Sequence, residues 1–147
     1  MDTMQCRDAL RKKGQYFTTN ETLQTTLVDF IRRDPQRILE PSVGRGDLVL
    51  AAKKKYGDAI FDMYEIDEDI PLLSPLQKQD VCYGDFLAQP HEHTYDTIIG
   101  NPPFVKKTKG NLYLLFIRKC VQLLNPGGEL VFIVPSDFMK LTSAIQI

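Results

Sequence analysis

Short apolar segments alternate with helical segments along most of this chain, and this alternation constrains its fold more than any other feature. The apolar segments predict five strands, at residues 37–42, 60–66, 80–84, 95–100 and 129–134. Segments of crossover length separate them, which favours a parallel sheet with helices on its faces. The almost continuous apolar run at 130–134 is typical of a strand buried on both sides. We therefore expect one α/β domain over residues 1–147.

Helical periodicity and capping residues predict helices at residues 4–13, 20–33, 47–56 and 111–124, and a further helix starting at Asp137. Thr19 or Asn20 can cap the second helix. The Asn-Pro-Gly-Gly segment at 125–128 predicts a turn before the last strand. Because open parallel sheets bind ligands at the carboxyl ends of their strands, the residues that follow each strand are the candidate site.

Composition and charge exclude several classes of protein. The net charge is −1, but residues 56–100 hold ten acidic residues and one basic residue, whereas residues 101–119 hold five basic residues and no acidic ones. No apolar run approaches the roughly 20 residues of a membrane span, and the amino-terminal segment lacks the apolar core of a secretory signal. Three scattered cysteines favour a reducing compartment, so we expect a cytoplasmic protein with no membrane partner.

A glycine-containing loop follows the first predicted strand. Gly44 and Gly46 allow a tight turn and the close approach of a ligand to backbone N–H groups at a helix start. Val49 stands where a dinucleotide fingerprint has a third glycine or alanine, and this loop has no Walker-type Gly-Lys-Ser/Thr. The loop favours a nucleoside or amino-acid ligand over a pyrophosphate, while a simple strand-to-helix turn is the alternative.

Acidic residues follow the second and third predicted strands. Glu65 lies about 20 residues beyond the glycines, the spacing at which a carboxylate grips a ribose diol. Asp67 is a weaker candidate for the same contact, and a solvated acidic loop is the alternative. Asp85 can accept a hydrogen bond from an adenine amino group while Phe86 packs on the base, unless Asp85 is only a turn residue.

The tetrapeptide Asn101-Pro102-Pro103-Phe104, after the fourth predicted strand, is the most specific motif in the chain. Its prolines fix the backbone and remove two N–H donors, which leaves the Asn101 side-chain oxygen and the Pro102 carbonyl as acceptors. Two converging acceptors suit a planar –NH₂ group, because holding both hydrogens frees the nitrogen lone pair as a nucleophile. Phe104 can stack on a planar substrate. The motif therefore predicts a catalytic site, with a rigid turn as the alternative.

Two further clusters are less specific. His91-Glu92-His93 has no cysteine or carboxylate partner at a familiar spacing, so we expect no metal site. Lys106, Lys107 and Lys109 predict a solvated loop or, beside a substrate pocket, a contact with phosphates.

The order of these motifs resembles that of the amino-group DNA methyltransferases that use S-adenosylmethionine, and more narrowly the N6-adenine members in which the cofactor motifs precede the catalytic motif. The resemblance covers residues 14–139. It implies a catalytic site made by Asn101, Pro102, Pro103 and Phe104. It implies a cofactor site made by Tyr16, Phe17, Thr18, Glu40, Pro41, Ser42, Gly44, Gly46, Glu65, Ile66, Asp85, Phe86 and Asn101.

Within that implied cofactor site, each end of the cofactor has its own residues. Thr18 would contact the methionine carboxylate, Glu65 the ribose, and Ile66, Asp85 and Phe86 the adenine. The chain departs mildly from the family pattern, since Thr19 stands where a proline is usual and Glu40 stands where an aspartate is usual.

The resemblance implies a Rossmann-like class I methyltransferase core, whose full sheet has seven strands. Five are predicted here, so we expect an incomplete core without a target-recognition domain. The chain is then expected to bind S-adenosylmethionine more readily than it catalyses transfer by itself. The exposed edge of the fifth strand predicts a homo-oligomer or a partner chain that completes the sheet.

The implied activity is methyl transfer to adenine N6 in DNA, of the restriction–modification type, by a cytoplasmic or nucleoid-associated protein. Lys106, Lys107 and Lys109 would then contact DNA. Cytosine N4 is a second possible acceptor. Protein glutamine and ribosomal-RNA guanine are alternatives, because their methyltransferases resemble this chain at the tetrapeptide, and a non-catalytic cofactor-binding partner subunit is a third reading.

Overall fold

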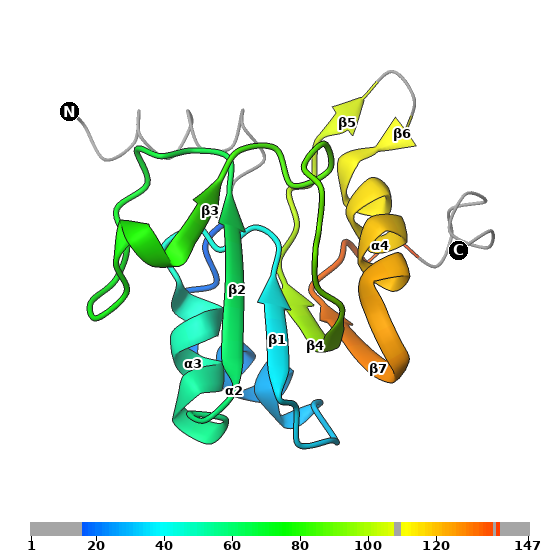
Figure 1. Ribbon diagram of the computed structural model, residues 1–147. Helices are drawn as coiled ribbons and strands as arrows, with labels where there is room; N and C mark the ends of the chain where they lie inside the picture. Colours follow the sequence, from blue (N-terminus) through cyan, green and yellow to red (C-terminus); the bar gives the residue numbers. More distant parts are fainter. Residues whose placement is uncertain (1–15, 108–109, 137, 139–147) are drawn as a thin grey trace.

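The computed structural model describes residues 16–107, 110–136 and 138 (Figure 1). It contains the helices α2 (Glu21–Asp29), α3 (Asp47–Lys55) and α4 (Leu112–Leu123) and the short 3₁₀ helix η1 (Lys78–Asp80). Its strands are β1 (Arg37–Glu40), β2 (Ile60–Glu65), β3 (Val81–Tyr83), β4 (Tyr95–Gly100), β5 (Lys106–Lys107), β6 (Gly110–Asn111) and β7 (Leu124–Phe132). The expected helix at 4–13 and the expected helix start at Asp137 lie outside the described residues.

Five strands form one parallel sheet in the order β3-β2-β1-β4-β7 (Figure 1). β1 lies in the centre, with Leu39 beside Asp62 of β2 and Ile98 of β4. The chain builds the sheet outward from β1 in both directions, so the strand order reverses between β1 and β4. The predicted parallel α/β sheet is confirmed, and its strands all end at the same edge.

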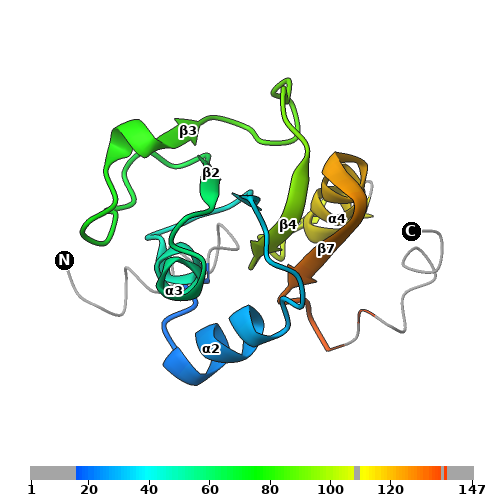
Figure 2. The ribbon, with the colours of Figure 1, turned by 60° about the horizontal axis from the view of Figure 1, so that its bottom comes forward.

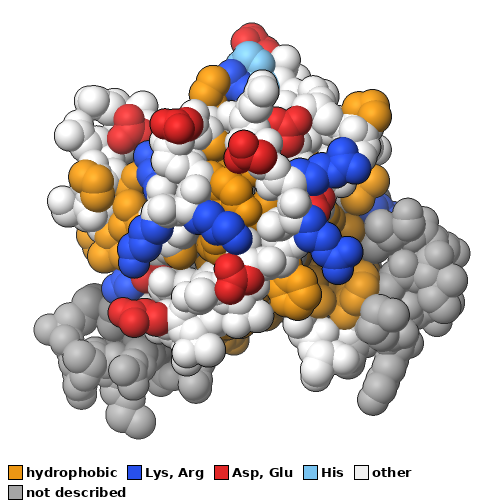
Figure 3. All heavy atoms as spheres, turned by 90° about the horizontal axis from the view of Figure 1, so that it is seen from below, with side chains coloured by type: hydrophobic (Ala, Val, Ile, Leu, Met, Phe, Trp, Pro, Cys, Tyr) orange, Lys and Arg blue, Asp and Glu red, His pale blue; other side chains and the backbone are white. Residues whose placement is uncertain are grey.

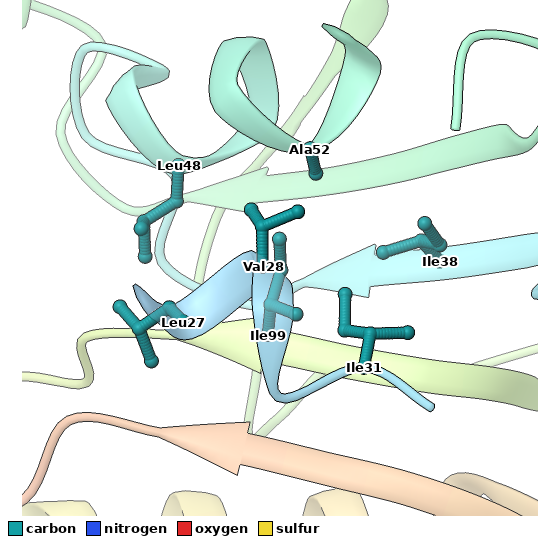
Figure 4. Close-up of a cluster of buried hydrophobic side chains, with 7 residues drawn as sticks. All are labelled: Leu27, Val28, Ile31, Ile38, Leu48, Ala52 and Ile99. Carbon is teal, nitrogen blue, oxygen red and sulfur yellow. The ribbon is translucent and has the colours of Figure 1, made fainter. Parts of the chain in front are cut away.

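The sheet is buried on both faces because helices cover each of them, and successive strand residues point to opposite sides. Leu39 and Ile98 pack against α4, whereas their neighbours Ile38 and Ile99 face α2 and α3. Figure 2 shows α2 and α3 on one side of the sheet and α4 on the other. The α2–α3 side is filled by a cluster of apolar side chains, namely Leu27, Val28, Ile31, Ile38, Leu48, Ala52 and Ile99 (Figure 4).

The helix α2 ends earlier than the predicted end at residue 33. Of the two expected caps, Thr19 and Asn20, the structure uses Asn20, whose side chain accepts from the Leu23 N–H at 2.9 Å. At the other end, the backbone N–H groups of Arg32 and Arg33 donate to the Glu129 carboxylate at 3.2–3.3 Å. These donors are held by a residue almost 100 positions away, so the local pattern could not predict where α2 ends.

The strand β7 includes the segment predicted to be a turn. Leu124 pairs with Tyr95 and Glu129 pairs with Thr97, so residues 125–128 stand opposite Asp96 alone. Asn125 donates to the Asp96 carboxylate at 2.9 Å, and this hydrogen bond is the main reason that the pKa of Asp96 is lowered. The Asn-Pro-Gly-Gly segment is therefore a bulge inside a paired strand, anchored by Asp96, and the predicted boundary at 129 is wrong.

The expected solvated loop at 106–110 contains two short antiparallel strands. In the hairpin, Lys106 of β5 pairs with Asn111 of β6, and the Leu112 N–H donates to the Val105 carbonyl at 2.9 Å. These backbone hydrogen bonds hold the start of α4 beside the residues that follow Phe104. In the part of the chain that the structure describes, no helix is long and apolar enough to cross a membrane.

Candidate functional site

A pocket of about 220 Å³ lies where the carboxyl ends of β1, β2, β3 and β4 meet, as the strand reversal predicts. Of the residues expected at the site, it is lined by Tyr16, Phe17, Pro41, Ser42, Gly44, Glu65, Ile66, Asp85, Phe86, Asn101 and Pro103. A small cavity of about 20 Å³, beside the pocket, is lined by Thr18 and Glu40 among others. The expected residues Gly46, Pro102 and Phe104 line neither cavity.

The same pocket is also lined by residues that sequence reasoning missed, namely Ile70, Gly84, Leu87, Leu112 and Phe116. None of them has a side chain with reactive groups, so motif reasoning gave no reason to select them. For Leu112 and Phe116, the one available signal was their place on the apolar face of the predicted helix at 111–124.

The two glycines of the loop after β1 have different tasks. Gly44 has a φ of 56° and lines the pocket, and its N–H donates to Glu65 Oε2 at 2.8 Å. Gly46 has a φ of 97° and forms the amino-terminal cap of α3, where a Cβ would collide with the Leu76 side chain. Gly44 is therefore placed to approach a ligand, whereas Gly46 shapes the turn.

The Glu65 carboxylate lies in the wall of the pocket and is 7% exposed. Oε1 accepts from the N–H groups of Ile66 and Asp67 at 2.9 and 3.0 Å, and Oε2 accepts from Gly44 at 2.8 Å. A carboxylate oxygen can accept two hydrogen bonds, so Oε2 retains one position for a hydroxyl group of a ligand. Asp67, the weaker candidate, does not line the pocket.

Apolar and acidic side chains form the opposite part of the pocket. Phe86 is almost fully buried and stacks on Phe116 with ring centroids 5.4 Å apart, while Ile66 is exposed. Asp85 Oδ1 accepts a hydrogen bond from the Leu87 N–H at 3.0 Å, and no described residue donates a hydrogen bond to Asp85 Oδ2. A flat ring that entered here would meet two apolar walls and one carboxylate acceptor.

His91 belongs to the support of this wall. One ring nitrogen lies 3.3 Å from the Tyr64 hydroxyl and the other lies 2.9 Å from the Phe86 carbonyl oxygen. The ring also packs on Phe86, with centroids 4.6 Å apart. Both nitrogens of His91 are therefore engaged, one with Phe86 and one with Tyr64. Among the described residues there is no group of three or more side chains that could hold a metal ion.

Asn101 stands at the end of β4 and lines the pocket. Its Nδ2 donates to the Tyr16 carbonyl oxygen at 2.9 Å and to Thr18 Oγ1 at 3.3 Å. Its Oδ1 is buried and has no hydrogen-bond partner among the described residues. Native proteins rarely leave a buried acceptor unpaired, so Oδ1 would gain its missing partner from a ligand donor that reached it.

The aromatic ring of the tetrapeptide lies between two tyrosines. Phe104 stacks on Tyr16 with centroids 5.9 Å apart and an angle of 30°, and it meets Tyr113 edge-on at 5.9 Å. Pro102 is fully buried, and Pro103 lines the pocket. The four residues therefore do not act as one wall, since Asn101 and Pro103 face the pocket while Phe104 packs beside it.

Glu40 lies beneath the pocket and is 2% exposed. Its Oε1 accepts from the Ser42 N–H at 2.9 Å, and a Cβ at Gly100 would lie 2.9 Å from the same oxygen. Burial, followed by the proximity of Glu65, raises the pKa of Glu40 to about 8 despite the Ser42 hydrogen bond. Glu40 is therefore mostly protonated near neutral pH. It lines the small cavity and not the main pocket.

The basic residues expected beside the pocket are only partly described. Lys106 and Lys107 form β5, which Figure 1 shows above α4 on the same side of the molecule as the carboxyl ends of β1 and β2. Lys109 lies outside the described residues. The opposite end of the molecule, seen in Figure 3, carries positive and negative side chains interspersed over its surface, so it offers no continuous positive face.

Comparisons with known proteins identify the family of the chain. Residues 50–146 match the Eco57I restriction-modification methylase family. The chain is similar to the Type II methyltransferase M.HincII of Haemophilus influenzae, with 30% identity over 153 residues that cover 89% of this chain and 29% of the relative. It is also similar to the Type II methyltransferase M.TthHB8I of Thermus thermophilus, with 33% identity over 132 residues that cover 71% of this chain and 30% of the relative. The chain thus spans less than a third of the length of these relatives.

Solved structures establish the fold. The SAM-dependent O-methyltransferase of Thermotoga maritima superposes with a TM-score of 0.67 at 17% identity, covering 95% of this chain and 53% of that chain. The predicted Rossmann-like class I methyltransferase fold is therefore confirmed.

Proposed function

The chain belongs to the Eco57I restriction-modification methylase family, and from this premise we propose that it binds S-adenosylmethionine and methylates the N6 amino group of adenine in DNA. The observation that supports the proposal best is the Asn101 side chain. It lies in the pocket wall, and its buried Oδ1 has no partner among the described residues. The amino group of a substrate would supply the missing donor.

The pocket fits S-adenosylmethionine on the chemistry of its donors and acceptors. Glu65 Oε2 retains an acceptor position for a ribose hydroxyl. Ile66 and Phe86 provide apolar walls for the adenine ring, and Asp85 provides an acceptor for its amino group. These groups lie together in one pocket, although they come from the ends of different strands.

When bound, S-adenosylmethionine supplies an electrophilic methyl group on its sulfonium. The task of the chain is to position the acceptor amine for in-line displacement, since positioning and electrostatics dominate such reactions. Asn101 Oδ1 accepts one N–H of the amine and the Pro102 carbonyl accepts the other, which together draw the nitrogen lone pair out of the ring. Once methylated, the amine is acidic and loses its proton to water, so the reaction needs no strong general base.

DNA is the proposed partner. A duplex adenine must rotate out of the helix to reach Asn101, and Phe104 offers a planar face once the Tyr16 ring, but not its backbone, turns aside. Lys106, Lys107 and Lys109 lie in the segment that follows the tetrapeptide and are proposed to contact phosphates.

The test measures cofactor binding and methyl transfer separately. Calorimetry of the chain with S-adenosylmethionine should give saturable binding, and a tritiated-methyl assay should label adenine N6 in single-stranded DNA more readily than in duplex DNA. Asn101→Ala should lower transfer by about 10²–10³-fold and leave cofactor affinity largely intact. Asn125→Ala is the matched control, because it makes the same change at the opposite end of the sheet.

Each other outcome has a distinct meaning. Label on cytosine N4, on guanine of ribosomal RNA or on a Gly-Gly-Gln peptide, with none on adenine, would replace the adenine assignment by that acceptor. Cofactor binding without any label would make the chain a cofactor-binding partner subunit. Absence of cofactor binding would contradict the proposal at its first step.

A further inference from the structure

The segment 16–18 contacts both the cofactor pocket and the proposed acceptor residue. Tyr16 and Phe17 line the pocket, and the Phe17 ring packs so closely on Gly44 that a Cβ there would lie 3.1 Å from it. The backbone of Tyr16 and the side chain of Thr18 both accept hydrogen bonds from Asn101. The segment therefore joins the glycine loop to the end of β4.

The Tyr16 carbonyl decides which way the Asn101 amide points, and the Thr18 hydroxyl adds a second contact to the same nitrogen. Nδ2 has two N–H groups and finds two acceptors, the Tyr16 carbonyl and Thr18 Oγ1. The reverse orientation would place Oδ1 against the Tyr16 carbonyl oxygen, which can only accept. The amide is thus held with its nitrogen toward the segment, and its oxygen is left as the acceptor without a protein partner among the described residues.

Thr18 is itself anchored. It is 6% exposed, and its carbonyl accepts from Gln24 Nε2 of α2 at 2.6 Å. It does not line the main pocket but the small cavity beside it, together with Asn101. Its hydroxyl is therefore placed to act on Asn101 rather than on a ligand in the main pocket.

We propose that Thr18 is a positioning residue for methyl transfer: with the Tyr16 carbonyl, it fixes the Asn101 amide so that Oδ1 faces the acceptor amine. This inference rests on the proposed function for its chemistry, and it replaces the contact between Thr18 and the methionine carboxylate that the family resemblance implies. The geometry of the amide itself can be tested without any activity.

The test compares Thr18→Val, which keeps the shape and removes the hydroxyl, with Thr18→Ser, which keeps the hydroxyl. Loss of one hydrogen bond should lower kcat about 3- to 10-fold in Thr18→Val, with the dissociation constant for S-adenosylmethionine unchanged. Thr18→Ser should restore kcat to within about twofold. An increased dissociation constant with unchanged kcat would overturn the proposal and make Thr18 a cofactor contact.

A second readout needs no turnover. The ¹⁵N side-chain amide signals of Asn101, assigned by their loss in Asn101→Ala, should exchange with solvent about 3- to 10-fold faster in Thr18→Val than in the wild-type chain or in Thr18→Ser. Equal exchange in all three would overturn the positioning role. If no DNA is methylated but the exchange follows this pattern, the proposed function fails while the positioning of the amide stands.

If Thr18→Val does not fold, Gln24→Met serves in its place, because it removes the part-buried donor of α2 that holds the Thr18 carbonyl. It should increase the same exchange rate, and an unchanged rate would count against the proposal.

Discussion

The buried carboxyl of Glu40 should make the stability of the fold depend on pH between 5 and 8. Its ordinary pKa of 4.5 applies to the unfolded chain, whereas burial raises the folded value to about 8. Below pH 4.5 both states hold the proton, and its contribution to stability is fully present. As the pH rises toward 8, the unfolded chain releases the proton first, so the free energy of unfolding falls.

The size of the effect follows from the shift in pKa. Over the pH range in which only the folded state holds the proton, each pH unit lowers the free energy of unfolding by about 1.4 kcal/mol. The loss between pH 5 and pH 8 is therefore on the order of 4 kcal/mol. Glu40→Gln removes the titration and keeps the shape, and its amide oxygen can still accept from the Ser42 N–H. At pH 5 the free energy of unfolding of the variant should equal that of the wild-type chain within about 1 kcal/mol, and at pH 8 it should be higher than that of the wild-type chain.

Urea unfolding followed by circular dichroism at pH 5, 6.5 and 8 measures this difference. Glu21→Gln is the control, because Glu21 is exposed in the first turn of α2. If wild type and Glu40→Gln lose stability in parallel from pH 5 to pH 8, Glu40 does not hold its proton in the fold and the reasoning is refuted.

Three further predictions concern the ligand, the thiols and the sheet edge. Glu65→Gln should weaken S-adenosylmethionine binding about 10- to 100-fold in calorimetry, because it replaces a charged acceptor in the pocket wall, and unchanged affinity would remove Glu65 from the site. In a Cys6→Ser background, a thiol reagent should modify exposed Cys82 and should modify buried Cys120 only after denaturant is added. Burial is the main reason that the pKa of Cys120 is raised, and equal rates of modification at both thiols in the native chain would contradict this burial. Among the described strands β7 pairs only with β4, so sedimentation velocity should show concentration-dependent self-association, and a monomer at all concentrations would oppose it.

The sequence by itself determined which segments form the strands of the parallel sheet and at which edge of the sheet the candidate site lies. β4 was predicted with the bounds it has, and β1, β2 and α3 differ from prediction by no more than two residues at either end. These bounds depend on apolar alternation, capping residues and glycine turns, which involve residues only a few positions apart, so the local sequence is enough to predict them. Because the carboxyl ends of parallel strands meet at one edge, the same reading brought Gly44, Glu65 and Asn101 to one pocket.

Only the tertiary structure decided the state of the groups in and around that pocket. Distant segments provide each of the deciding contacts. Gly100 covers the buried Glu40, Tyr16 and Thr18 accept from the Asn101 amide, and the Glu129 carboxylate accepts from the N–H groups that follow α2. The protonation of a carboxyl and the direction of an amide depend on desolvation and on specific partners. Such partners exist only when residues about 60 to 100 positions apart are brought into contact, which no local pattern encodes.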